Sequence, residues 1–221
     1  MVTLYQIYFD KKQIKDLDPE MIAYDNSSYN RVISTRENER EYRVFKDNYE
    51  AKTHLDSTYT GFLSWKFFRK TNMRGGSLKQ YIINDENKHD VYFVNGASIP
   101  KVRNVWQQGN NRHKHLIKIT QHVFDNIGYD IDLSNFSNSI DQCCFCNFWV
   151  GNKNFWDKYM EFTIPIYKYL TASEGGLDGE MRELFLQRAD GGIDANYFSF
   201  IMERLFTTLL VVDPDIKFKR T

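Results

Sequence analysis

VTLYQIYFD, the stretch from Val2 to Asp10, decides the fold. It is apolar and aromatic and ends on an acidic residue, which is typical of a buried first strand in an open α/β sheet. In such sheets, ligands bind in the crevice at the carboxyl ends of the strands. The opening therefore predicts a ligand-binding α/β domain without indicating which ligand it binds.

Strand-like and helical stretches alternate along the rest of the chain. We expect strands at residues 2–10, 58–67, 90–95 and 142–150, and helices at 37–52, 78–83, 113–127, 153–170, 181–188 and 197–212. Gly128 follows the third of these helices, where glycine commonly caps a helix C-terminus. Strands interleaved with helices predict an α/β fold with a mostly parallel central sheet flanked by helices. We expect residues 1–221 to form a single domain, either a whole protein or one domain of a longer chain.

The composition limits the classes of partner. The 221 residues carry 29 basic and 29 acidic side chains, and this balance argues against nucleic acid, because nucleic-acid surfaces need a basic excess. The opening lacks the basic and apolar pattern of a signal peptide, and no apolar run reaches the roughly 18 residues of a membrane helix. We therefore expect a cytoplasmic protein with no transmembrane segment and no nucleic-acid partner, while the oligomeric state stays open.

Cysteine and histidine do not indicate a metal site. Cys143, Cys144 and Cys146 are too closely spaced for a typical zinc site, and their odd number favours reduced thiols buried in a strand. His113 and His115 would point in different directions on a helix, and His115 and His122 would lie about 10 Å apart along its axis. We therefore expect these histidines on the surface. The standard phosphate-loop, dinucleotide, zinc-protease and serine-hydrolase motifs do not occur.

Acidic residues offer two places for a divalent cation. Asp130 and Asp132 form an Asp-x-Asp sequence, but it follows a helix and a glycine, which favours an ordinary turn. Asp90 begins the strand at 90–95 rather than ending it, and Lys88 occupies the position where a second acid would help. Asn95 does lie at the carboxyl end of that strand, where ligands are expected.

The order of several segments resembles a group of glycosyltransferases of bacterial and large-virus polysaccharide biosynthesis. The segments that carry the resemblance are LYQIYFD at Leu4–Asp10, Asp25-Asn26 with Glu39 downstream, YTGFLSWKF at Tyr59–Phe67, DVYFVN at Asp90–Asn95, NVWQQG at Asn104–Gly109 followed by His113, FCNFWV at Phe145–Val150 and FIMERLF at Phe200–Phe206. None is specific alone, but together they cover most of the chain in the expected order. The resemblance implies the A-type glycosyltransferase fold, a nucleotide-binding α/β sheet with an acceptor-binding half.

The resemblance also implies an activity. Such hexosyltransferase-like enzymes move a sugar from a nucleotide-diphosphate sugar to a hydroxyl group of a glycan acceptor, often with Mn²⁺ or Mg²⁺ bridging the diphosphate. The family pattern places an Asp-x-Asp sequence where this chain has Lys88-His89-Asp90. Asp90 is thus the single acid at the implied metal position, and Lys66 or Lys88 could neutralise the diphosphate instead.

Individual site residues follow from the same resemblance. We expect Tyr5, Gln6 and Asp10 near the nucleoside, Lys66 and Asn95 near the diphosphate or sugar, Asn26 and Trp65 among the nucleotide-sugar-binding residues, and Glu203 as the catalytic base. Plainer roles stay open: Tyr5 and Trp65 as core residues, and Glu203 as an ion-pair partner of Arg204. The alternative function is a non-catalytic carbohydrate- or nucleotide-binding module with a degenerate metal site, which Lys88 supports.

Overall fold

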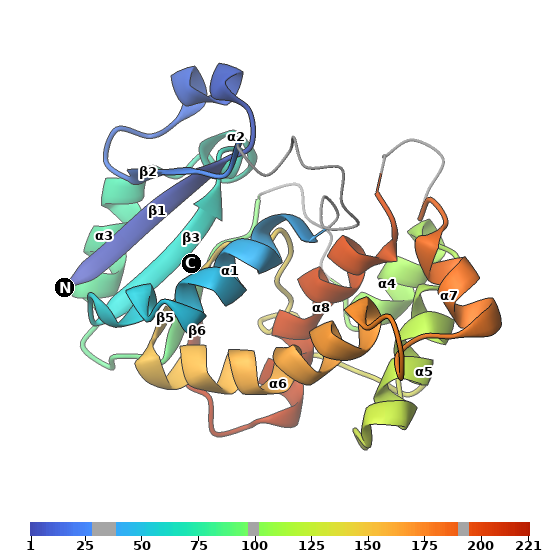
Figure 1. The fold of residues 1–221 in the computed structure, drawn as a ribbon. Helices are drawn as coiled ribbons and strands as arrows, with labels where there is room; N and C mark the ends of the chain where they lie inside the picture. The colour runs from blue at the N-terminus through green and yellow to red at the C-terminus, as the bar shows by residue number, and fades with distance from the viewer. Residues whose placement is uncertain (28–38, 97–101, 190–194) are drawn as a thin grey trace. The chain divides into compact units, whose positions relative to one another are not determined.

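The computed structural model describes residues 1–27, 39–96, 102–189 and 195–221. The chain divides into two compact units (Figure 1). The sheet unit comprises Met1–Pro100, Cys144–Lys158 and Asp213–Thr221, and the helical unit comprises Lys101–Cys143 and Tyr159–Val212. The prediction that residues 1–221 form one domain stays a prediction.

A six-stranded sheet forms the centre of the sheet unit. Its strands are β1 (Val2–Tyr8), β2 (Ile22–Asp25), β3 (Tyr59–Ser64), β4 (Val91–Phe93), β5 (Trp149–Asn152) and β6 (Phe218–Arg220), in the order β2-β1-β3-β5-β4-β6. β1 pairs in parallel with β2 and β3, and β4 pairs in parallel with β6. β5 is antiparallel to both β3 and β4, so it alone is reversed in this sheet. The predicted α/β fold with a mostly parallel sheet is confirmed.

One face of the sheet packs against two short helices, α2 (Phe67–Thr71) and α3 (Gly75–Ile83). Leu63 of β3 and Val150 of β5 share a buried apolar cluster with Leu78 and Ile82 of α3. These side chains lie on one face because successive residues of a strand point to opposite sides. Burying them removes apolar surface from water, which is the main driving force for this layer.

The opposite face packs against α1 (Arg40–Glu50) and the start of α6 (Lys153–Thr171). The ring of Trp149 lies 5.0 Å from that of Phe45 in α1 and 4.6 Å from that of Trp156 in α6, measured between centroids. Phe62 of β3 contacts Trp156 edge to face at 5.9 Å. Aromatic pairs in such geometries stabilise a core beyond the area they bury. The unit therefore has three layers, helix, sheet and helix.

The helical unit contains residues 159–171 of α6 together with α4 (Val105–Arg112), α5 (Leu116–Ile127), α7 (Gly179–Leu186) and α8 (Tyr197–Val212). Buried hydrogen bonds tie α8 to α4. Nε of Arg204 donates to the Val105 carbonyl at 3.0 Å, and Nε1 of Trp106 donates to Oγ1 of Thr208 at 3.0 Å. No helix within the described ranges is both long enough and apolar enough to cross a membrane.

Several predicted helix and strand limits are corrected by the structure. The predicted helix at 113–127 begins at Leu116, and a separate helix, α4, precedes it. His115 separates them with a left-handed φ of 78°. The predicted strand at 58–67 ends at Ser64, because the chain turns there into α2. Two strands, β2 and β6, were not predicted.

The cysteine and histidine predictions are confirmed only in part. All three cysteines are free, but they lie in the loop before β5 rather than within a strand. His113 is buried rather than on the surface, and its ring stacks on Phe200 with centroids 3.7 Å apart. It is buried because it packs on Phe200 and its Nδ1 lies 3.3 Å from the Ala189 carbonyl oxygen.

Candidate functional site

The parallel strands place most of the predicted site residues at one edge of the sheet. Asp10 follows β1, Asn26 follows β2, Trp65 and Lys66 follow β3, and Asn95 follows β4. Because these strands run in one direction, their carboxyl ends meet at the same edge, here called the carboxyl edge. This is the edge at which open α/β sheets bind ligands.

Three basic side chains gather at the carboxyl edge around α2. Nζ of Lys66 and Cζ of Arg69 each lie 5.2 Å from the centroid of the Trp65 ring. Burial lowers the pKa of Lys66 below its usual value, and the positive charges of Lys70 and Arg69 lower it further. Within the described part of the chain, neither Lys66 nor Arg69 forms an ion pair with an acidic side chain. We call Lys66, Arg69 and Lys70 the cation cluster. The charges of Lys66 and Arg69, which have no acidic partner among the described residues, suit an anion.

The segment 145–148 lies between the end of β4 and the cation cluster. Phe145 donates its backbone N–H to Oδ1 of Asn95 at 3.0 Å. Nζ of Lys70 lies 2.9 Å from Sγ of Cys146 and 5.9 Å from the centroid of the Phe148 ring. Asn95 is thus linked to Lys70 through this segment, and both lie at the same edge.

Gln6 and Tyr5 have contacts within the sheet unit. Gln6 is fully buried, its Oε1 accepts the Asp18 N–H at 2.6 Å, and its Nε2 donates to the Ser64 and Trp65 carbonyls, each at 3.4 Å. It therefore positions the turn that carries Trp65. The Tyr5 ring stacks on Phe62 at 4.7 Å, and burial raises the pKa of its hydroxyl group. This stacking is the packing role that the sequence left open.

Asp10 and Asn26 shape the loops at the carboxyl edge. The exposed Asp10 caps the 3₁₀ helix Lys11–Asp16, and its Oδ1 accepts the Lys12 N–H at 2.8 Å. Asn26 is buried, and its backbone N–H donates to the Tyr8 carbonyl at 2.9 Å. Both residues lie at the carboxyl edge, and their contact with a ligand stays a prediction.

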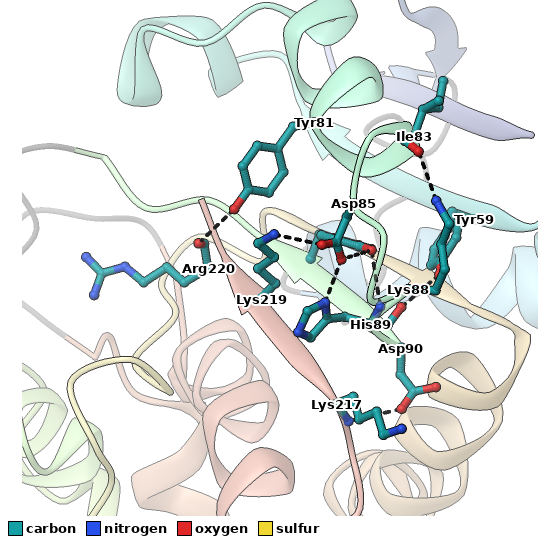
Figure 2. Close-up of polar contacts among 11 residues, drawn as sticks. Tyr59, Tyr81, Ile83, Asp85, Lys88, His89, Asp90, Lys217, Lys219 and Arg220 are labelled. Atoms are coloured by element: carbon teal, nitrogen blue, oxygen red, sulfur yellow. Dashed lines mark hydrogen bonds and ion pairs between the residues drawn. The ribbon is translucent and has the colours of Figure 1, made fainter.

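Asp90 lies at the opposite edge of the sheet, because it precedes β4 instead of following it. Its Oδ2 accepts the Lys217 N–H at 3.0 Å (Figure 2). Its Oδ1 accepts from Nδ2 of Asn152 at 2.9 Å. In the described ranges, no three His, Cys, Asp or Glu side chains gather to hold a metal ion. Both carboxylate oxygens of Asp90 already accept hydrogen bonds from N–H groups. A divalent cation instead prefers about six oxygen ligands, so these surroundings do not fit one. The structure thus separates Asp90 from Lys66 and Asn95.

A buried acid near Asp90, not anticipated from the sequence, is the centre of a polar network. Asp85 is 5% exposed, and its carboxylate contacts Nζ of Lys219 at 2.8 Å, the Tyr92 hydroxyl at 2.7 Å and Nδ1 of His89 at 2.6 Å (Figure 2). Hydrogen bonding from Lys219, and then from Tyr92 and His89, holds the pKa of Asp85 well below its usual range. The network ties β6 and the loop after α3 to β4.

Glu203 belongs to the helical unit and lies on α8. Its Oε2 is 3.7 Å from Nη1 of Arg204, and its side chain is partly exposed. Arg204 is buried and also donates to the Phe200 carbonyl and to Oε1 of Gln108. The ion-pair role that the sequence left open is present, and the role of Glu203 as a base stays a prediction.

Comparison with known proteins identifies the fold. No protein-family model and no curated protein matches the sequence. The structure is similar to that of a bifunctional glycosyltransferase, WbbM, in its apo form, with a TM-score of 0.51 and 15% sequence identity. The similarity covers 99% of this chain and 44% of that chain, so this chain spans less than half the length of WbbM. The chain therefore has a glycosyltransferase-like fold.

Proposed function

We propose that this protein binds a nucleotide-diphosphate sugar at the carboxyl edge and transfers the sugar to a hydroxyl group of a glycan acceptor. The observation that carries the proposal is the cation cluster. Lys66 and Arg69 lie together on one indole ring at the ligand-binding edge, without acidic ion-pair partners among the described residues. Like charges held together in this way favour an anionic ligand, and a diphosphate supplies the matching charge.

The chemistry of the transfer explains why such a cluster is useful. An acceptor oxygen attacks the anomeric carbon, the bond from that carbon to the diphosphate breaks, and the nucleoside diphosphate leaves with increased negative charge. Fixed cations near the leaving oxygens stabilise that charge in the transition state. In this proposal, Lys66 and Arg69 contact the diphosphate, Lys70 adds positive charge, and Asn95 orients the segment 145–148. An inverting reaction also needs a carboxylate base, for which Glu203 stays the sequence-based candidate.

The residues around Asp90 do not fit the Mn²⁺ or Mg²⁺ that the family resemblance implied. No step is therefore assigned to a metal ion at Asp90, and the cation cluster takes the charge-neutralising role.

Binding titrations with substituted proteins test the proposal. The wild type is titrated calorimetrically with UDP-glucose, UDP-galactose and GDP-mannose, and the tightest of these is then used with Lys66→Gln and Arg69→Gln. Each substitution removes a charge-assisted contact and should weaken binding about 10-fold or more. Lys79→Gln is the matched control, because Lys79 lies on α3, outside the cation cluster, and its Nζ donates to the Glu20 carbonyl at 2.6 Å. Equal affinities for all four proteins would refute the assignment of the cluster.

The alternative is a binding module that holds the same ligand without catalysis. One observation favours it: among the described residues, no three His, Cys, Asp or Glu side chains gather to hold a metal ion. The catalytic base, Glu203, is also assigned from the sequence alone. An assay for release of the nucleoside diphosphate, with and without glycan acceptors, separates the two functions. Release that depends on Lys66 supports the transferase, whereas tight binding without release supports the module.

A further inference from the structure

Asn147 lies in an unusual backbone conformation within the segment 145–148. Cys146 and Asn147 are consecutive non-glycine residues with positive φ values of 67° and 52°. Such left-handed residues are uncommon outside glycine and tend to persist at functional sites, where the surroundings hold them in place. Asn tolerates this conformation better than most residues, but two in succession form a constrained turn.

The side chain of Asn147 is buried with an unused acceptor. Asn147 is 9% exposed, and its Oδ1 has no hydrogen-bond partner among the described residues. Buried side-chain oxygens nearly always have a partner in native proteins, so an unpaired one needs a specific explanation. A ligand that donates a hydrogen bond is one such explanation.

The neighbours of Asn147 place it beside the proposed ligand site. On one side, Sγ of Cys146 contacts Nζ of Lys70 in the cation cluster at 2.9 Å. On the other side, the Phe148 ring packs against Phe67, the first residue of α2, with centroids 5.2 Å apart. The constrained turn is therefore held on both sides by the helix that carries the cluster.

We propose that Oδ1 of Asn147 accepts a hydrogen bond from a hydroxyl group of the bound nucleotide sugar, and this inference rests on the proposed function. Phosphate oxygens at neutral pH are acceptors and cannot donate to Oδ1, so the partner of Oδ1 is not the diphosphate. Hydroxyl groups are donors, and they occur both on the ribose and on the transferred sugar. Asn147 thus reads the sugar part of the ligand, while the cation cluster holds its phosphates.

The test uses Asn147→Gly with the chemically identical control Asn72→Gly. Asn72 is an exposed residue at the end of α2 with a φ of 56°, so both substitutions place glycine in a left-handed position that suits it. Both variants should therefore fold, and thermal unfolding checks this directly. Each is titrated with the nucleotide sugar that binds the wild type best, with the matching nucleoside diphosphate (UDP or GDP), and with inorganic pyrophosphate.

We expect Asn147→Gly to weaken nucleotide-sugar binding about 5- to 10-fold and to leave pyrophosphate binding unchanged, while Asn72→Gly changes neither. A parallel loss with the nucleoside diphosphate identifies a ribose hydroxyl, and a loss confined to the nucleotide sugar identifies a hydroxyl of the transferred sugar. Unchanged nucleotide-sugar affinity in Asn147→Gly, or an equal loss with pyrophosphate, would overturn the inference while the proposed function stands. A wild type that binds no nucleotide sugar overturns both.

Discussion

Lys66 and Asp85 are charged residues of the sheet unit whose surroundings shift their pKa values for different reasons. Asp85 is stabilised in its charged form, because Lys219, Tyr92 and His89 all contact its carboxylate. Lys66 is destabilised in its charged form by burial and by the like charges of Lys70 and Arg69. The contacts of Asp85 are explained by the fold alone, whereas like charges held together around Lys66 favour an anionic ligand. This contrast separates the structural network from the proposed ligand site.

The Asp85→Asn substitution should lower the free energy of unfolding by about 1–3 kcal/mol at neutral pH, because buried donors lose a charged acceptor. The folded-state pKa of Asp85 is depressed, so its stabilisation is present above the unfolded value of about 4 and is lost as the pH falls below it. As the pH falls below about 4, the free energy of unfolding of the variant should therefore decrease less steeply than that of the wild type. Urea unfolding across this range measures both effects, with the exposed Asp16→Asn as control. An Asp85→Asn protein as stable as the wild type at neutral pH would contradict the network.

The Lys66→Gln substitution should leave stability within about 0.5 kcal/mol of the wild type, or raise it. The folded-state pKa of Lys66 is lowered, so its protonated form opposes folding at neutral pH, and this penalty disappears as the pH rises towards the unfolded pKa of about 10.4. Removing the charge relieves the penalty. Urea unfolding at neutral pH gives the answer, and a clear loss of stability would show that Lys66 has a structural role instead of a binding role.

At the scale of elements, the long amphipathic patterns were predictable and the short edge elements were not. The predicted helix 197–212 coincides with α8, and Gly128 caps α5 with a φ of 77° as expected. In contrast, β2 is four residues long and largely exposed, so it has no buried alternation from which to infer a strand. The three-residue β6 resembles a charged tail, and it is a strand because it pairs with β4.

Two glycines of the helical unit should respond to alanine for opposite reasons. Gly128→Ala places a side chain in open space but at positive φ, which should cost about 1 kcal/mol of stability. Gly109→Ala lies inside α4, where alanine is ordinarily favourable by about 1 kcal/mol. Its Cβ would lie 2.2 Å from Nε of the buried Arg204, so we expect a net loss of about 1–3 kcal/mol. Urea unfolding compares the two, and a stabilised Gly109→Ala protein would show that Arg204 does not anchor α8 to α4.

At the scale of the whole molecule, the fold is similar to that of a glycosyltransferase even though only 15% of the aligned residues are identical. Such similarity survives because hydrophobic pattern and strand order, rather than particular residues, determine the sheet. The position of Asn95 at the carboxyl end of its strand was predictable from the sequence, whereas Lys66 was proposed from the family resemblance and was expected within the strand 58–67. Arg69 and Asn147 were not, because their places depend on how α2 and the segment 145–148 pack together, and no short sequence pattern encodes that packing.

The proposed site should make the stability of the whole chain depend on nucleotide sugar and not on added metal. A ligand that binds only the folded state at 100 times its Kd stabilises by about 2.7 kcal/mol, which for a chain of this size raises Tm by about 5–10 °C. We expect this shift with the nucleotide sugar in chelator as well as in manganese, because the charges of Lys66 and Arg69 neutralise the diphosphate. The Lys66→Gln/Arg69→Gln double variant should lose most of the shift in both conditions. A shift abolished by chelator in the wild type would instead place a metal ion at the diphosphate, and the cation cluster would then have to act on another part of the ligand.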